Sequence, residues 1–392
     1  MRWKRWWTKS KSPFVLSLSK HRFSFFCGNI EGEERPFDKL RANGDCLAKR
    51  AWHSAPMNRT ALLAALPLAF AVPAWGQEEA EPVTPASIVA ASAPEEWVEI
   101  DPDHILVMRL ADNGSDAPRD VVIQLLPEPF SQPWVENIRT LARAHWWDGT
   151  SVYRVVDNWV AQWGGGDPEL DMDPGPMPDG VLDTQGLAYP STASDLHRPL
   201  VEEYLQNAFE GIVDSRIAWL DGHAGFPRTG YYADLEVWVD GWPISAGDGG
   251  ETVWPVHCYA HVGVARDLAP DTGTGSELYA VIGHAPRQLD RNIAVVGRVI
   301  EGIEHLSTLP RGTGDAGVYE DRAEDTPIEW VRLASDVEES EHWRYEYLDT
   351  TSDSFAAYVA NRANRHDAFY EVPAGGVDIC NVQVPIRQIP AE

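Results

Sequence analysis

Lysine is scarce in this chain of 392 residues, and it is missing from most of its length. All six lysines lie at or before Lys49, and every basic residue after Met57 is an arginine. A single folded domain rarely changes its lysine usage so abruptly. Residues 1–56 also lack a sustained hydrophobic period. We interpret them as a disordered leader translated from a mis-assigned start; a genuine basic, disordered leader is the alternative.

Basic residues of either kind are few in the rest of the chain. Residues 1–56 hold 12 of the 32 basic residues and 5 of the 60 acidic ones, which leaves 20 basic and 55 acidic residues beyond them. The formal net charge of that remainder is therefore −35. A surface of this sign repels nucleic acid and anionic membranes. The composition thus argues against nucleic acid as a partner, and against a membrane surface once the predicted signal peptide is removed.

A hydrophobic run of membrane-spanning length is missing as well. The apolar run at 61–74 has 14 residues, whereas a span needs about 20. It follows Met57 and Arg59, and the small residues at 74–76 stand where a signal peptidase reads. We predict a signal peptide over 57–76 and export to the periplasm. Residues 77–100, rich in Ala, Pro and Glu at their start, are expected to form a disordered linker.

Cysteine is rare, with four residues in the whole chain. Two of them, Cys27 and Cys46, precede Met57, so Cys258 and Cys380 remain in the mature chain. In an oxidising compartment these two can form a disulfide that ties the C-terminal tail to the core. Two buried free thiols are the alternative, and the sequence leaves both open.

The hydrophobic pattern after residue 100 is mostly that of strands. Strands are predicted at 104–110, 120–126, 152–156, 159–163, 235–239, 259–265, 278–282, 292–300 and 328–335. Helical spacing predicts helices at 200–209, 303–309 and 354–365, and another that begins after Ser131, which is placed to cap it with Pro133 in the first turn. Many strands with few short helices favour a closed antiparallel barrel.

Three stretches, in order, resemble the cyclophilin-type peptidyl-prolyl isomerases. They are VENI at 135–138 with DGTSVYRVV at 148–156; WVAQ at 159–162 with glycines and Asp167; and GVA at 263–265 with GSELY at 275–279, LD at 289–290 and VGRVIEG at 296–302. The resemblance implies a mainly β fold over 101–335: a closed eight-stranded antiparallel barrel with two capping helices. A long insertion interrupts it at about 168–256, and a C-terminal extension, 336–392, is expected to pack on it.

The resemblance also implies the catalytic residues, Arg154 and Gln162. Rotation of an X–Pro amide loses resonance, with a barrier of about 20 kcal/mol. The nitrogen of a twisted amide is more basic, so a guanidinium donor stabilises the transition state more than the planar ground state. Gln162 is expected to orient Arg154 and the substrate backbone. No metal or cofactor is implied, and the expected partners are proline-containing polypeptides.

The remaining site positions implied by the resemblance form a substrate pocket. They are Trp159, Val160, Ala265, Glu277, Tyr279 and Leu289. By the resemblance, Ala265 matches a position that binds the substrate backbone, and Tyr279 matches a pocket phenylalanine. Glu277 replaces a glutamine that is usual in the family, Gln288 stands where a tryptophan is common, and Ile293 occupies a usual histidine position. We therefore expect an altered pocket around a normal catalytic arginine.

Two other functions compete with isomerisation. A catalytically weak cyclophilin-like barrel could bind proline-containing segments as a chaperone or scaffold. The thirteen tryptophans after Met57 could instead stack on sugars in a carbohydrate-binding protein. Arg154 in register with Gln162 favours the isomerase, because a sugar platform needs neither. Client proteins and oligomeric state cannot be read from the sequence.

Overall fold

The computed structural model describes residues 83–114, 117–165, 175–192, 232–248, 251–337, 343–367 and 369–390. Each of them belongs to one structural unit, Gln77–Glu392. The predicted leader, the signal peptide at 57–76 and the helix at 200–209 lie outside the described residues. Within the described ranges, no helix is both long enough and apolar enough to cross a membrane.

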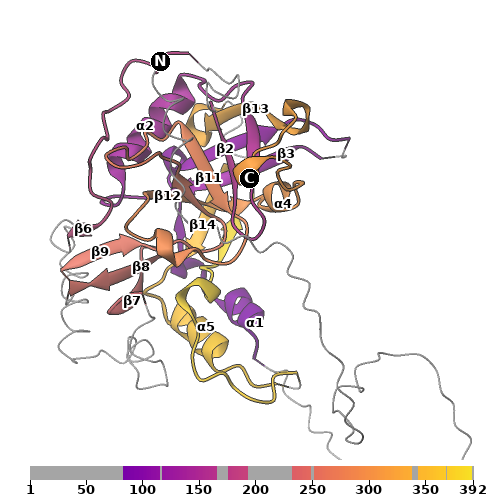
Figure 1. Cartoon of the computed structure of the whole chain (residues 1–392). Coiled ribbons are helices and arrows are strands. Elements are labelled where there is room, and N and C mark those ends of the chain that lie inside the picture. The colour runs from indigo at the N-terminus through magenta and orange to yellow at the C-terminus, as the bar shows by residue number, and fades with distance from the viewer. Residues whose placement is uncertain are drawn as a thin grey trace, which may run out of the picture. The chain divides into compact units, whose positions relative to one another are not determined.

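Eight strands close into an antiparallel barrel, in the order β10-β11-β5-β4-β13-β2-β3-β12 (Figure 1). Their bounds are β2 Ile105–Leu110, β3 Arg119–Leu125, β4 Ser151–Val155, β5 Val160–Gly164, β10 His261–Val264, β11 Glu277–Val281, β12 Val295–Glu301 and β13 Thr326–Leu333. The predicted fold class, a mainly β chain with a closed eight-stranded antiparallel barrel, is confirmed.

The barrel is filled by side chains that alternate along each strand. Leu106 and Met108 of β2 meet Ile123 and Leu125 of β3 in the core, because these strands pair in antiparallel register. Residues on one face of a strand recur with a period of two, so the intervening side chains face outward. The alternation that predicted the strands therefore also separates the core from the outer face.

Helix α2, Gln132–Arg143, covers part of this core. Trp134, Ile138 and Leu141 recur on one face of the helix and belong to the barrel's hydrophobic cluster. The predicted capping role of Ser131 is wrong. Its backbone is left-handed, with φ of 54°, and its side chain makes no capping hydrogen bond. The short helix α4, Glu304–Ser307, adds the buried Leu306.

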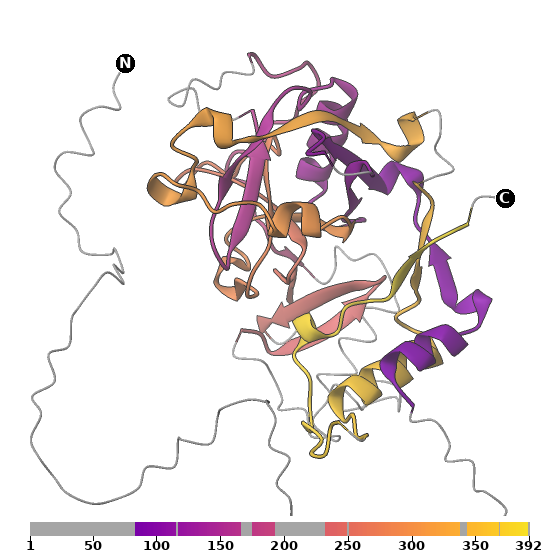
Figure 2. The ribbon, with the colours of Figure 1, turned by 90° about the vertical axis from the view of Figure 1, so that its right-hand side faces the viewer.

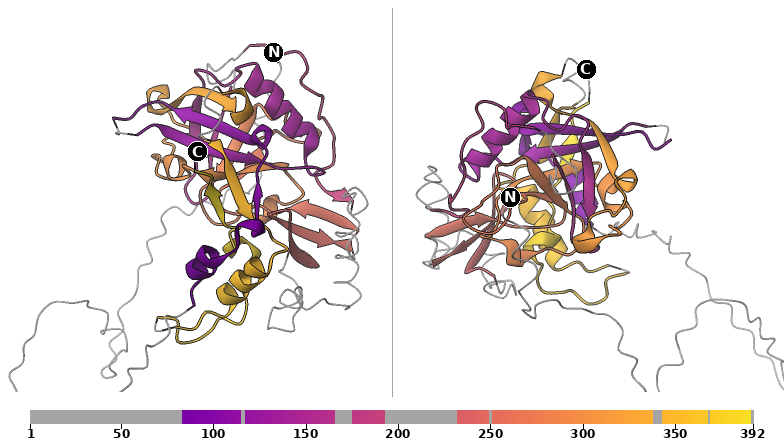
Figure 3. Two further views of the ribbon diagram at one scale, coloured as in Figure 1. Left: turned by 180° about the vertical axis from the view of Figure 1, so that it is seen from behind. Right: turned by 45° about the horizontal axis from the view of Figure 1, so that its top comes forward.

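The insertion contributes a four-stranded antiparallel sheet beside the barrel, in the order β6-β9-β8-β7 (Figure 3). Its strands are β6 Ser191–Thr192, β7 Leu235–Val239, β8 Trp242–Gly247 and β9 Thr252–Pro255. Trp242 and Ile244 of β8 are buried in the same hydrophobic cluster as the barrel interior. The sheet is therefore packed on the barrel through apolar contacts.

The two ends of the described chain meet in a third sheet, β1-β14-β15. It is formed by β1 Trp97–Glu99, β14 Tyr345–Leu348 and β15 Ile386–Gln388. Helices α1, Pro85–Ala91, and α5, Asp353–Ala363, lie side by side below it (Figure 2). A second hydrophobic cluster joins these elements, with Trp97, Leu348 and Phe355 among its buried members.

In residues 83–100, the part of the expected linker 77–100 that the structure describes, the chain forms regular elements. Thr84 caps α1, because its side chain accepts from the backbone N–H of Ser87 while the Ser87 side chain accepts from Thr84 in return. Pro85 occupies the first turn, where a missing N–H carries no penalty. Trp97 is then buried. This Ala- and Pro-rich segment thus forms a capped helix and a strand, contrary to the prediction of disorder.

Candidate active site

Three of the predicted site residues lie in one row across adjacent barrel strands. Arg154 on β4 pairs with Gln162 on β5, and Gln162 pairs with Tyr279 on β11. Tyr279 in turn pairs with Gly263 on β10. Directly opposed residues in antiparallel strands present their side chains on the same face. Because Ala161 and Leu278, their chain neighbours, belong to the barrel core, the row faces outward.

Arg154 is held in place by two hydrogen bonds. Its Nη1 donates to Oε1 of Gln162 at 2.9 Å, and its Nε donates to the carbonyl oxygen of Ala316 at 2.8 Å. The guanidinium carbon lies 5.4 Å from the centre of the Trp159 ring. Burial lowers the pKa of Arg154, but an arginine side chain keeps its charge in proteins. Among the described residues, none accepts from its Nη2.

Tyr153 is a site residue that the sequence analysis missed. Its hydroxyl accepts from Nε2 of Gln162 at 2.5 Å and donates to Oε2 of Glu277 at 2.8 Å. Burial, and then the charge of Glu277, raises the pKa of Tyr153, so the hydroxyl stays protonated and can donate. Strict alternation would turn Tyr153 away from Arg154. An irregularity in pairing between Val152 and Arg154 lets both side chains reach Gln162.

Glu277 lies beside the row, opposite Gly164 of β5. A Cβ on Gly164 would lie 2.3 Å from Oε1 of Glu277, so the glycine leaves room for the carboxylate. Glu277 is thus connected through Tyr153 to Gln162, and through Gln162 to Arg154. The position that departs from the family's usual glutamine accepts a hydrogen bond from Tyr153, which in turn accepts from the glutamine that holds Arg154.

An apolar cluster adjoins the row. Val160, Tyr279 and Val281 are buried in it, and Trp159, Ala265 and Leu289 pack against them together with Ile293. All five apolar positions of the predicted pocket therefore converge although they span 130 residues of sequence. Ala265 was expected to bind the substrate backbone. Its N–H already donates to the carbonyl oxygen of Glu277 at 2.9 Å, so it offers a methyl group to the cluster and no backbone donor.

Tyr279 has a polar contact that a phenylalanine at this position would lack. Its hydroxyl lies 3.1 Å from Nε2 of His257, and the two rings stack with an interplanar angle of 12°. A Cβ on Gly263 would lie 2.3 Å from the Tyr279 hydroxyl oxygen. The pocket tyrosine therefore needs both a glycine beneath it and a hydrogen-bonding partner.

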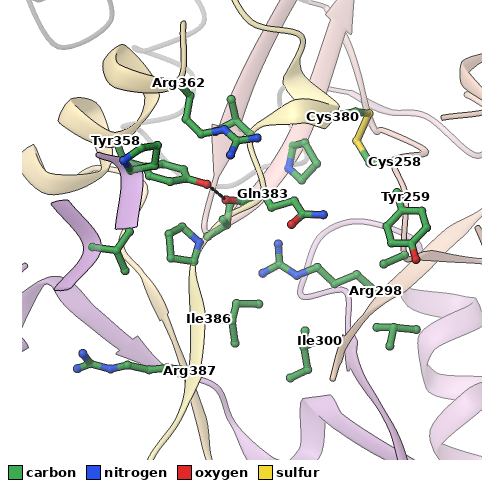
Figure 4. Close-up of a pocket in the computed structure, with 18 of the residues that line it drawn as sticks. Cys258, Tyr259, Arg298, Ile300, Tyr358, Arg362, Cys380, Gln383, Ile386 and Arg387 are labelled. Atoms are coloured by element: carbon green, nitrogen blue, oxygen red, sulfur yellow. Dashed lines mark hydrogen bonds between the residues drawn. A yellow bond between two sulfur atoms is a disulfide. The ribbon is translucent and has the colours of Figure 1, made fainter. Parts of the chain in front are cut away.

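A separate cavity of about 750 Å³ lies between the barrel and the C-terminal extension (Figure 4). Cys258 and Cys380, the predicted pair, form a disulfide in its wall. Arg298, whose pKa burial lowers to about 9, reaches toward Gln383 there. None of the catalytic or substrate-binding positions lines this cavity. No group of residues in the described ranges could hold a metal ion.

Comparison with known proteins places these features in context. Residues 117–334 match the family described as cyclophilin type peptidyl-prolyl cis-trans isomerase/CLD. In fold, the chain is similar to the cyclophilin AquaCyp293 from Hirschia baltica, with a TM-score of 0.53 and 20% identity over 79% of this chain and 99% of that one. A cyclophilin-type isomerase from Cryptosporidium parvum, solved in the presence of the dipeptide Ala-Pro, aligns at 12% identity over 58% of this chain and 98% of its own, with a TM-score of 0.28. No curated protein matches the chain.

Proposed function

The chain belongs to the cyclophilin-type peptidyl-prolyl cis-trans isomerase family, and from this membership we propose that it rotates X–Pro bonds of exported proteins with the help of Arg154. The observation that carries the proposal is the row Arg154–Gln162–Tyr279 on one outer face of the barrel. It sets a fixed cation beside an apolar cluster against which a proline ring could pack.

The proposed chemistry follows from what each part does to the amide. The cluster around Val160, Tyr279 and Leu289 removes water from the proline ring and the imide carbonyl, and an unhydrated amide more readily gives up its charge separation. The Nη2 hydrogens of Arg154 then donate to the imide nitrogen, which accepts only when the bond is twisted. Gln162 and the Ala316 carbonyl hold the guanidinium, so little reorganisation is needed at the transition state.

Two observations support the proposed compartment. The Cys258–Cys380 disulfide is typical of an oxidising environment. The signal-like residues 57–76 precede the barrel in the sequence. Together they favour clients that are themselves exported.

The proposal is tested by Arg154→Ala in a protease-coupled proline-isomerisation assay at equal concentrations of folded protein. We expect a loss of at least about tenfold in kcat/KM, which corresponds to about 1.4 kcal/mol of transition-state stabilisation. The kcat/KM of Arg154→Lys should lie between those of the wild type and Arg154→Ala, because a lysine keeps the charge without the planar donor. Arg143→Ala, which removes an exposed arginine of α2 with its own carboxylate partners, serves as the control. Equal rates for Arg154→Ala and wild type would overturn the catalytic proposal.

The second candidate function is a peptide-binding chaperone or scaffold. It is favoured by Glu277, Gln288 and Ile293, which depart from the residues usual at these pocket positions in the family. Binding of an X–Pro peptide that is unaffected by Arg154→Ala, with no measurable turnover, would support it. The carbohydrate-binding alternative has little support, because no tryptophan of the described ranges is among the exposed large hydrophobic residues.

A further inference from the structure

A buried chain of polar groups runs from the pocket floor into the insertion sheet. Nδ1 of His257 lies 2.8 Å from Oδ1 of Asp290, and Nε of Arg287 donates to Oδ2 of the same carboxylate at 2.7 Å. Nη2 of Arg287 donates to Oε1 of Glu236 on β7 at 2.7 Å, and to Oγ of Ser245 on β8 at 3.1 Å. With the Tyr279–His257 contact at the other end, the barrel pocket and the insertion are joined.

Four members of the chain, His257, Tyr279, Arg287 and Asp290, are buried, and Glu236 is partly buried. An ionised Asp290 can only accept, so Nδ1 of His257 donates to it, and in the neutral tautomer of His257 that this selects, Nε2 accepts from the Tyr279 hydroxyl. Burial raises the pKa of Tyr279, which keeps that hydroxyl protonated. Burial would also raise the pKa of Asp290, but its hydrogen bond from His257 and its proximity to His257 and then to Arg287 outweigh this and lower it. Asp290 therefore stays an anion between two donors.

The barrel alone does not account for Arg287. The side chain of Arg287 is only 5% exposed, and one of its two carboxylate partners, Glu236, lies on the insertion. A buried guanidinium needs such partners, since an unpaired charge in the interior is strongly unfavourable. The insertion thus supplies Glu236 to a hydrogen-bonded network that ends at Tyr279 in the apolar cluster.

We propose that the insertion sheet positions the proline pocket through the chain Glu236–Arg287–Asp290–His257–Tyr279, with these residues acting as positioning groups for substrate binding. The proposal rests on the proposed function in placing the proline ring against Tyr279. Anchoring the hydroxyl of Tyr279 fixes the plane of its ring and takes up its polar end, so that the surface turned to the substrate remains apolar. The insertion thereby sets affinity for X–Pro segments.

A double-mutant cycle separates positioning from simple stability. Arg287→Met breaks the chain in the middle, and Tyr279→Phe removes the hydroxyl through which it acts. The dissociation constant of a proline-containing tetrapeptide is measured by calorimetry for the full chain and its variants, alongside kcat/KM. We expect Arg287→Met to raise the dissociation constant at least fivefold in the wild-type background and less than twofold in Tyr279→Phe. KM should rise while kcat changes little.

The control is Arg109→Met, which removes another partly buried arginine with a carboxylate partner, Asp120, on strands away from the groove. It should lower the melting temperature and leave peptide affinity unchanged. If Arg287→Met does not fold, Glu236→Gln takes its place in the cycle, because it neutralises the far end of the chain with an isosteric side chain. Equal effects of the chain mutation in both backgrounds, or none in either, would overturn the proposal.

The outcome is distinguishable from failure of the proposed function. Coupling in peptide affinity with no effect of Arg154→Ala on rate would leave a peptide-binding module whose pocket is still positioned by the insertion. Loss of rate in Arg154→Ala without coupling in affinity would retain the isomerase and remove the role of the insertion.

Discussion

Tyr153 connects Arg154, through Gln162, to Glu277, the pocket position where a glutamine is usual in the family. It accepts from the glutamine that holds Arg154 and donates to Glu277. A neutral glutamine at 277 could accept the same hydrogen bond, so the charge of Glu277 is an addition that the network tolerates. Because charge-assisted hydrogen bonds are stronger than neutral ones, the carboxylate fixes Tyr153, and through it Gln162, more firmly.

Tyr153→Phe should lower kcat/KM by about five- to thirtyfold, since a buried hydrogen-bonded group left without its partner costs about 1–2 kcal/mol. Both Gln162 and Glu277 lose a partner in this variant. Tyr345→Phe is the matched control, because Tyr345 also donates to a carboxylate, Glu301, away from the groove. The role assigned to Tyr153 would fail if the two variants had the same kcat/KM.

Glu277→Gln should change substrate affinity more than turnover. A group that contacts the substrate equally in its ground and transition states alters KM and leaves kcat nearly unchanged. We expect a two- to fivefold change in KM, on the order of 0.5–1 kcal/mol, for the loss of one partly exposed charge. Steady-state kinetics with tetrapeptides that carry a lysine or a glutamate before proline measure it. A fall in kcat at constant KM would contradict this view of position 277.

At the scale of elements, alternation predicted all eight barrel strands to within a few residues, because one face of each strand is buried and the other is not. In the insertion the same rule found β7, predicted at 235–239, but missed β8 and β9. Every residue of β8 is buried, so no period of two is visible, and Pro243 and Gly247 disguise it further. Helix α1 was missed because its Ala-rich sequence also fits a linker.

The candidate site likewise contains residues that the sequence could identify and residues that only the fold brings together. Arg154, Gln162 and Tyr279 could be found because a resemblance in sequence marks positions along the chain. Tyr153 could not, since the pairing irregularity that turns it toward the groove is a property of two strands together. His257 and Asp290 are 33 residues apart in sequence, and only the fold places their side chains in contact.

The C-terminal extension depends on its covalent link to the barrel. Cys258 and Cys380 are 122 residues apart in sequence, and closing a loop of this length restricts the unfolded chain strongly. Cys380→Ser should therefore lower the free energy of unfolding by about 2–5 kcal/mol, as measured by denaturant titration. A reductant should destabilise the wild type similarly and leave the variant unchanged; equal sensitivity in both would show that this disulfide is not responsible.

At the scale of the whole molecule, a buried histidine makes stability depend on pH. Burial, and then the charge of Arg298, lowers the pKa of His261 to about 3, against about 6.5 in an unfolded chain. Between these values the unfolded state binds the extra proton. The contribution of His261 is therefore fully present above pH 6.5 and is lost at up to about 1.4 kcal/mol per pH unit as the pH falls toward 3.

His261→Phe should remove that part of the pH dependence. Free energies of unfolding are measured for both proteins at pH 7.5, 5.5 and 4.5, and the difference between them isolates this group from the many carboxylates. We expect the free energy of unfolding of His261→Phe to rise relative to that of the wild type as the pH falls. A difference that is constant with pH would mean that His261 is not held neutral in the folded state.

The closure of the barrel also has a consequence for how the chain reaches its fold. Leu110 on β2 pairs with Ile328 on β13, so the first barrel strand cannot complete its pairing until the last strand has folded. The insertion adds to the length of chain between these two strands. The equilibrium penalty for a longer loop grows only logarithmically, but a high contact order slows folding. Until then, one apolar edge of β2 stays unpaired and can form intermolecular pairs with other chains. The insertion therefore affects the rate of folding, and aggregation during folding, more than the stability of the folded barrel.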